Sequence, residues 1–356
     1  MSKSRAGVKR RSRIAPAVKS ASIEGDTGSH GEAEKEHGAK GLVEPVSYAV
    51  TEAQAAAVES PVRLPDLPRI GIHAPIAGGL HNALLKSREL GCDAVQIFSR
   101  NPRGWRASPL ADDVVSRFRT LRTETRITPV VVHCNYLVNL SAANPDILEK
   151  SRVSFREEIE RAVRLGADYL VVHPGSAKGS CEADAIRVCA ESIKIACRGF
   201  DLGEFRILLE NTAGQGECIG HRFEHLRAII EDCAELDLGV CFDTAHAFTA
   251  GYDLREEDGF TATMEALEEN VGVRRVRALH FNDSKAEYNS RVDRHWHLGQ
   301  GHIGAEALRR IARHPDLAHA AFLLETPQDE TGDDARNLNV LRSFIQDETQ
   351  TAAARR

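Results

Sequence analysis

Short apolar runs alternate with longer amphipathic stretches from Arg69 to about residue 347. Eight runs have the length and composition of buried strands, and they cover 69–75, 94–100, 129–135, 168–175, 206–212, 238–244, 275–283 and 318–326. Each run precedes a stretch with helical periodicity, and these stretches cover 80–90, 110–125, 145–166, 182–197, 223–233, 256–269, 305–313 and 333–345. Eight strand–helix pairs over 69–347 predict an α/β protein with a single (β/α)8 TIM barrel.

A doubly wound open sheet is the alternative architecture for the same alternation. That fold commonly carries a Gly-rich phosphate-binding turn after its first strand. No such turn follows the run at 69–75, so the barrel is favoured.

The two ends of the chain lack this pattern. Residues 1–23 carry seven Lys/Arg and no acid, whereas 24–68 carry nine acids and three bases and end in the Pro-punctuated segment 61–68. We predict a disordered extension over 1–68, first basic and then acidic, and a short tail over 348–356. The basic segment 3–13 is compatible with a nucleic-acid-binding arm, a nuclear localisation signal, the start of a transit peptide or a tail without a specific role.

Composition narrows the class of protein. The 356 residues are 42% hydrophobic and 28% charged, and no apolar run reaches the 18 residues of a membrane span, so we expect no membrane partner. The eight cysteines are scattered and form no C-x-x-C pair, which favours a reducing compartment. The net charge of −6 argues against a nucleic-acid partner unless bound cations offset it.

Metal-ligand residue types stand at the ends of six consecutive apolar runs. They are His133, His173, Glu210, Asp243, His280 and Glu325. Barrel enzymes place their active sites at the carboxyl ends of the strands, so these side chains are expected to meet there. Taken alone, Asp243 before the small-residue segment 244–251, which we predict to be a loop, is equally compatible with a helix cap.

Two loops add further ligand types. His246 follows Asp243, and Asp293 and His295 are spaced so that an extended chain places them on one side. His297 shares this alternation, and we assign it a supporting role. The nine candidates exceed what one tetrahedral ion uses and suit three ions. Four carboxylates and five neutral imidazoles with three divalent cations leave a charge of +2, which would attract a phosphodiester and activate water for in-line displacement.

With these residues the chain resembles the endonuclease IV-type apurinic/apyrimidinic (AP) endonucleases. These are zinc enzymes of DNA base-excision repair in the xylose isomerase-like TIM barrel superfamily. The resemblance spans about 70–327. It rests on the ordered motifs NPRGW (101–105), HCNYLVNL (133–140), VVHPGS (171–176), LENTAGQG (209–216), GVCFDTAHAFTAGYDL (239–254), HFNDSK (280–285), SRVDRH (290–295) and LET (324–326).

The resemblance implies three zinc ions per chain. Their ligand sets would be His133, His173 and Glu210; then Glu210, Asp243, His280 and Glu325; and finally His246, Asp293 and His295. Glu210 would bridge two ions and serve the reaction by orienting the zinc-bound hydroxide.

The resemblance also implies the substrate. The family hydrolyses the phosphodiester 5′ to an abasic site in double-stranded DNA, leaves a 3′-hydroxyl and removes blocked 3′ ends. Arg103, Tyr136 and Leu137 stand at positions that match the residues inserted into DNA. We further expect a monomer, located in the cytoplasm or nucleoid of a bacterium, or in the nucleus or mitochondrion of a eukaryote.

Three positions depart from the family pattern. His73 lies in an altered opening motif and is expected to support the ligands rather than bind metal. Gly104 replaces a larger polar residue in the DNA-contacting loop, which puts the gap-filling geometry in doubt, and Ala245 replaces a common cysteine.

The main competing function is a divalent-metal sugar isomerase or epimerase on the same barrel. Its single Mn²⁺ or Mg²⁺ would use Glu210, Asp243, His280 and Glu325, and it leaves the other five candidates without a role. A non-enzymatic DNA-binding module is less favoured, because no recognition-helix pattern stands out.

Overall fold

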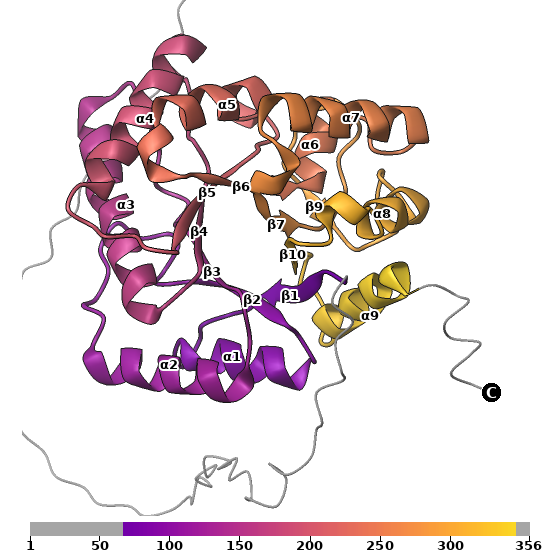
Figure 1. Ribbon diagram of the computed structural model, residues 1–356, viewed down its shortest axis with the longest axis horizontal. Coiled ribbons are helices and arrows are strands. Elements are labelled where there is room, and N and C mark those ends of the chain that lie inside the picture. The colour runs from indigo at the N-terminus through magenta and orange to yellow at the C-terminus, as the bar shows by residue number, and fades with distance from the viewer. Residues whose placement is uncertain (1–66, 347–356) are drawn as a thin grey trace, which may run out of the picture. The chain divides into compact units, whose positions relative to one another are not determined.

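A computed structural model describes residues 67–346, and a closed barrel of eight parallel strands forms its centre. The strands follow one another around the barrel in the order β1-β10-β7-β6-β5-β4-β3-β2, and Figure 1 shows them as an inner ring surrounded by helices. They are β1 (Arg69–His73), β2 (Ala94–Phe98), β3 (Val130–His133), β4 (Tyr169–Val172), β5 (Arg206–Glu210), β6 (Gly239–Asp243), β7 (Val276–His280) and β10 (Ala321–Leu324). The predicted TIM barrel is confirmed. The predicted extension up to residue 66 and the tail from residue 347 lie outside the described residues.

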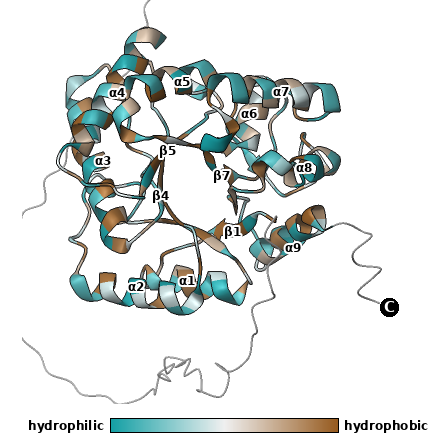
Figure 2. Cartoon of the chain, viewed as in Figure 1, coloured by the Kyte–Doolittle hydropathy of each residue, from teal (hydrophilic) through white to brown (hydrophobic). Residues whose placement is uncertain are grey.

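Eight of the nine helices within residues 67–346 follow the predicted amphipathic stretches to within two residues. Asn144 accepts hydrogen bonds from the backbone N–H groups of Asp146 and Ile147 and so caps α3, which ends at Gly166 with a positive φ of 72°. Figure 2 shows hydrophilic and hydrophobic residues side by side along the helices. Within 67–346, no helix combines the length and the apolarity needed to cross a bilayer. The helices are α1 (His81–Glu89), α2 (Asp112–Thr125), α3 (Pro145–Leu165), α4 (Glu182–Cys197), α5 (Phe223–Asp232), α6 (Thr244–Ala250), α7 (Glu257–Asn270), α8 (Ala305–Ala312) and α9 (Asp333–Ile345).

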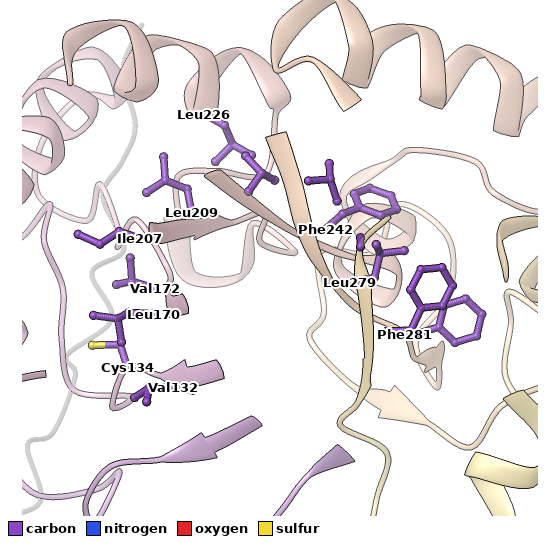
Figure 3. Packing of buried hydrophobic residues seen from close by; sticks show 14 of the residues in the cluster. Val132, Cys134, Leu170, Val172, Ile207, Leu209, Leu226, Phe242, Leu279 and Phe281 are labelled. Carbon is purple, nitrogen blue, oxygen red and sulfur yellow. The ribbon is translucent and has the colours of Figure 1, made fainter. Parts of the chain in front are cut away.

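Side chains alternate between two apolar layers along each strand, because successive residues of a strand point to opposite faces. In β3, Val131 belongs to the small cluster inside the barrel, whereas Val130 and Val132 pack into the larger cluster beneath the helices. Figure 3 shows members of this outer layer, among them Val172, Leu209 and Leu226. The inner cluster consists of Ala94, Val131, Val171, Leu208, Cys241, Ala278, Ala321 and Leu323.

Two features differ from the sequence-based expectation. The segment after β6, predicted as a loop, is helix α6, and Asp243 caps it by accepting a hydrogen bond from the backbone N–H of His246 at 2.6 Å. After β7 the chain forms a small antiparallel pair of β8 (Asp283–Ser284) and β9 (His295–Trp296). Two-residue strands are too short to leave a periodic pattern, so the sequence could not reveal them.

Candidate metal centre

The mouth of the barrel is lined by inward-facing polar side chains, one near the carboxyl end of each strand. They continue the alternation of the inner apolar cluster: His133 stands two residues after Val131, and Glu210 two residues after Leu208. The full set is His73, Gln96, His133, His173, Glu210, Asp243, His280 and Glu325. The strand period therefore explains why residues far apart in the chain gather in one place.

Glu210 lies at the centre of this set and is fully buried. Its carboxylate oxygens lie 3.2 Å from His133 Nε2, 3.0 Å from His173 Nε2, 3.2 Å from His246 Nδ1 and 2.9 Å from His280 Nδ1. A single carboxylate thus contacts four imidazoles from four different segments of the chain.

Two more carboxylates contact His280 and a fifth imidazole, that of His295. Asp243 Oδ2 lies 3.4 Å from His295 Nε2 and 3.8 Å from His280 Nδ1. Glu325 Oε2 lies 3.3 Å from His280 Nδ1 and 3.9 Å from His295 Nδ1. Asp243 therefore stands between two parts of the cluster.

Asp293 approaches from the loop between β8 and β9. Its Oδ1 lies 3.2 Å from His246 Nε2 and 3.8 Å from His295 Nε2. This loop and the first residue of β9 bring Asp293 and His295 to the mouth of the barrel.

Potential ligand atoms form four groups within which all atoms lie within 4.8 Å of one another. They are His133, His280 and Glu325; His133, His173 and Glu210; Asp243, His246 and His295; and Glu210, Asp243, His280 and Glu325. The first two predicted ligand sets appear among these groups. The third differs, because Asp243 joins His246 and His295 while Asp293 contacts both imidazoles from outside the group.

The imidazoles are oriented by hydrogen bonds to oxygen atoms. We assign the donating nitrogen as Nδ1 in His133, toward the carbonyl of Cys134 at 2.7 Å, and in His246, toward the carbonyl of Asn211 at 2.9 Å. In His280 it is Nε2, toward Gln96 Oε1 at 2.8 Å. Each ring then presents the lone pair of its other nitrogen to the carboxylates, which is the arrangement of metal-binding histidines.

Two ring nitrogens of the predicted ligands, His246 Nε2 and His295 Nε2, are buried without a hydrogen-bond partner among residues 67–346. The contact of His246 Nε2 with Asp293 lacks hydrogen-bond geometry despite its 3.2 Å separation. A buried nitrogen lone pair without a partner costs free energy unless a hydrogen-bond donor or a cation stands beside it. The donor set therefore fits divalent cations, and the centre has the ligands for metal binding.

The electrostatics agree with this interpretation. Burial alone would raise the pKa of Glu210, but His173 and His280 hold it well below its usual range. Burial alone would lower the pKa values of His173 and His246, but Glu210 raises the first, and Asp243 and Asp293 raise the second. Cations would compete with protons for the same lone pairs.

Three polar residues near the ligands were missed by the sequence analysis. Gln96 donates to Glu325 Oε1 at 2.6 Å besides accepting from His280. The Asn211 side chain donates to the backbone carbonyl of Asp243 and accepts from its N–H, and Asn282 Nδ2 donates to Asp243 Oδ2 at 3.2 Å. The sequence did contain one indication of the role of Gln96, because a glutamine is unusual inside an apolar strand.

The two predicted supporting histidines differ in position. His73 Nδ1 lies 2.8 Å from Glu325 Oε1, next to the ligands. His297 instead accepts from Asn337 on α9 at 3.0 Å and belongs to none of the four groups.

The predicted DNA-contacting residues lie beside the centre on two neighbouring loops. Tyr136 is 62% exposed, Leu137 is half-buried and Arg103 is exposed. A Cβ at Gly104 would meet its neighbours at ordinary contact distances, so the backbone there does not require glycine. Tyr136 and seven of the nine predicted ligands line a cavity of about 460 Å³, together with Arg294, which the sequence analysis had not singled out.

A closed parallel barrel with several His and carboxylate ligands at its mouth defines a metal-dependent TIM-barrel protein. The family model described as "Xylose isomerase-like TIM barrel" matches residues 84–346. A probable endonuclease 4 of Chloroflexus aggregans is 44% identical over 282 residues, which cover 78% of this chain and 98% of the relative. This chain belongs to the endonuclease IV family.

Solved structures agree with that assignment. The crystal structure of endonuclease IV from Thermus thermophilus is 41% identical, with a TM-score of 0.70, and the match covers 78% of this chain and 99% of that one. A D-tagatose 3-epimerase-like protein is 20% identical, with a TM-score of 0.61, and covers 80% of this chain and 99% of its own, which shows the barrel fold alone.

Proposed function

We propose that this protein is a zinc-dependent AP endonuclease of DNA base-excision repair. It hydrolyses the phosphodiester 5′ to an abasic site in double-stranded DNA, leaves a 3′-hydroxyl and removes blocking groups from 3′ ends. The observation that carries the proposal is the cluster of imidazoles and carboxylates around buried Glu210 in a member of the endonuclease IV family. The names of its relatives support cleavage of a nucleic acid.

Three zinc ions would share nine ligands. His133 and His173 would hold the first with Glu210, which would also bind the second. Asp243, His280 and Glu325 would complete the second site, and His246, Asp293 and His295 would form the third. A mixed set of nitrogen and oxygen ligands suits zinc.

When bound, the ions would supply a hydroxide nucleophile near neutral pH and positive charge for the phosphodiester. The chain's own residues hold that chemistry in place. Glu210 balances part of the positive charge from its buried position, and the hydrogen bonds to Gln96, Cys134 and Asn211 keep the imidazole rings in one orientation.

The two exposed loops would recognise the lesion. Tyr136 presents an aromatic ring to solvent directly beside the centre, and its ring lies 6.4 Å from that of His133. With Leu137 and Arg103 it would fill the space of an extruded abasic nucleotide, where no base resists extrusion. We further propose that the protein acts as a monomer.

The sugar isomerase alternative explains fewer residues. A single metal would use Glu210, Asp243, His280 and Glu325, yet His133 and His246 contact the same Glu210 carboxylate. A single-ion site gives these additional imidazoles no role.

The proposal is tested by metal analysis of purified protein together with a nicking assay. We expect about three zinc ions per chain and cleavage of a duplex with one abasic site without added Mg²⁺. An otherwise identical undamaged duplex serves as the control substrate. About one metal per chain, or an abasic duplex that stays intact, would contradict the proposal.

A second prediction concerns Gln96. Gln96→Leu is expected to lower zinc affinity or cleavage by roughly 10- to 100-fold, because residues that orient metal ligands have effects of this size. The leucine cannot accept from His280 Nε2 or donate to Glu325. Zinc affinity is measured by competition with a chelator. The matched control is Gln300→Leu on an exposed loop, and equal zinc affinities together with equal cleavage rates for the two variants would refute an orienting role.

A further inference from the structure

A buried ion-pair network lies behind the two loops that carry Arg103 and Tyr136. Its centre is Glu158 of α3, which lies on the same buried helix face as Phe155 and Ile159. The Glu158 side chain is only 1% exposed. Arg100, just past β2, donates from Nε to Glu158 Oε1 at 2.8 Å. A charged pair thus occupies a place where the helix otherwise packs with apolar groups.

Every oxygen of this carboxylate has a donor. Ser99 Oγ donates to Glu158 Oε2 at 2.7 Å, and Asn135 Nδ2 donates to Oε1 at 3.3 Å. Arg100 also donates to Glu157 and to the backbone carbonyl of Ser154. Desolvating two charges costs several kcal/mol each, and a well-packed apolar pair often stabilises a fold as well as a buried ion pair. Stability alone therefore does not account for the network.

The network holds the loop that carries Arg103. Arg161 of α3 donates to Ser99 Oγ at 2.9 Å and to the carbonyl of Ser108 at 3.0 Å. Ser99 and Arg100 precede the loop, and Ser108 lies near its other end, so α3 binds this loop at both of its ends.

The same network holds the neighbouring loop. Asn135 donates to Glu158 through its amide nitrogen, and its Oδ1 accepts from the backbone N–H of Leu137 at 3.0 Å. The loops also touch directly, because the N–H of Tyr136 donates to the carbonyl of Pro102 at 3.1 Å. Asn135 is therefore the side chain that joins the second loop to the ion pair.

We infer that Glu158 and its partners join the Arg103 loop and the Tyr136–Leu137 loop into one rigid unit, so that both loops reach a lesion in a fixed relative position. This inference rests on the proposed function. Groups that are already ordered lose less entropy when they bind, and rigid support keeps a recognition site accurate. Asn135 and Glu158 are positioning residues here, because they act through the loops and do not touch the DNA.

The test is a double-mutant cycle on binding to a duplex with a cleavage-resistant abasic analogue. Arg103→Ala, Leu137→Ala and the double variant are compared in the native background and in an Asn135→Ala background. Because the loops act as one unit, the native double variant should lose less affinity than the product of the single losses, by about fivefold or more. In the Asn135→Ala background the coupling should shrink, leaving at most the part that the direct hydrogen bond between Tyr136 and Pro102 transmits.

Asn144→Ala is the matched control, because it removes the capping asparagine side chain of the same helix without touching Glu158. It should keep the coupling. Ser99→Ala, which removes a hydroxyl from the network on the other loop, provides a second variant and should also weaken the coupling. Coupling of undiminished size in both Asn135→Ala and Ser99→Ala, or coupling that disappears in Asn144→Ala, would overturn the inference.

The cycle separates this inference from the proposed function. Native protein that nicks abasic DNA but shows no coupling between Arg103 and Leu137 refutes the rigid unit alone. Native protein that neither nicks abasic DNA nor prefers it to undamaged DNA refutes the proposed function, and the inference fails with it.

Discussion

Glu210→Gln is expected to lower cleavage of abasic DNA by about a thousandfold, more than the roughly 10- to 100-fold effect of a residue that only orients a ligand. The reason is that one carboxylate contacts four imidazoles and would bind two of the three ions. Glutamine keeps the shape of the side chain but supplies no negative charge. Single-turnover cleavage and metal content measured on the same preparation check this prediction.

The matched control for Glu210→Gln is Glu182→Gln. Glu182 is a half-exposed carboxylate on α4 that lies 3.7 Å from His225 Nε2 and 3.0 Å from Arg222, outside the metal centre. This variant should keep its metal and its activity. Near-native metal content and cleavage in Glu210→Gln would remove Glu210 from the centre.

Metal removal is expected to destabilise the protein more as the pH rises. In the metal-free chain, the pKa values of His173, His246 and His280 are raised above 6.5, because burial is outweighed by neighbouring carboxylates and, for His280, first by Cys241. Their contribution to stability is complete below pH 6.5 and is lost as the pH rises through the raised values. At higher pH the buried carboxylates face neutral rings.

The buried carboxylates set the lower pH limit of this stabilisation. The pKa values of Glu210 and Glu325 lie well below 4.5, because neighbouring imidazoles outweigh the effect of burial. Their contribution is present above pH 4.5 and is lost as the pH falls through the lowered values. The metal-free cluster is therefore most favourable between about pH 4.5 and 6.5.

Zinc reverses this dependence, because it binds neutral imidazoles and so binds better as the pH rises. Free zinc at a thousand times its dissociation constant stabilises the fold by about 4 kcal/mol, or roughly 10 °C in Tm for a barrel of this size. We expect the difference in Tm between zinc-loaded and metal-free protein to grow from pH 6 to pH 8.5. Calorimetry at each pH, with and without a chelator, measures it.

The comparison has an internal control. Burial lowers the pKa of His225, on α5, to about 4, and this histidine disfavours the fold as the pH falls below 6.5. It lies outside the metal centre, so its contribution cancels in the difference between loaded and metal-free protein. A difference in Tm that is constant or shrinks with rising pH would contradict the coupling of zinc to these imidazoles.

The barrel and most of the candidate ligands were predictable because both follow from the two-residue alternation of side chains along a strand. Strand alternation determines which residues face inward, and the last inward position of a strand necessarily lies at the mouth. His133 and Glu210 could therefore be identified from the position of a polar residue after an apolar run. Gln96 obeys the same rule, but it stands within its strand and an amide carries no obvious metal chemistry.

Other parts depend on contacts that local sequence does not contain. Helix α6 begins without an intervening loop because Asp243, the last residue of β6, is also its cap. Glu158 was hidden because a charged residue on a buried helix face is stabilised only by partners from other segments, here Arg100 and Asn135. Such partners become visible only once the tertiary structure is known.

Asp243 divides its two oxygens between separate tasks. Oδ1 accepts the hydrogen bond that starts α6, while Oδ2 faces His280 and His295. Asparagine would keep the first task and weaken the second by removing the charge, whereas glutamate would keep the charge and move both oxygens by the length of a methylene group. Both the helix cap and the charge beside the imidazoles therefore restrict substitution at this position. Even close chemical analogues of aspartate should be rare there among functional relatives.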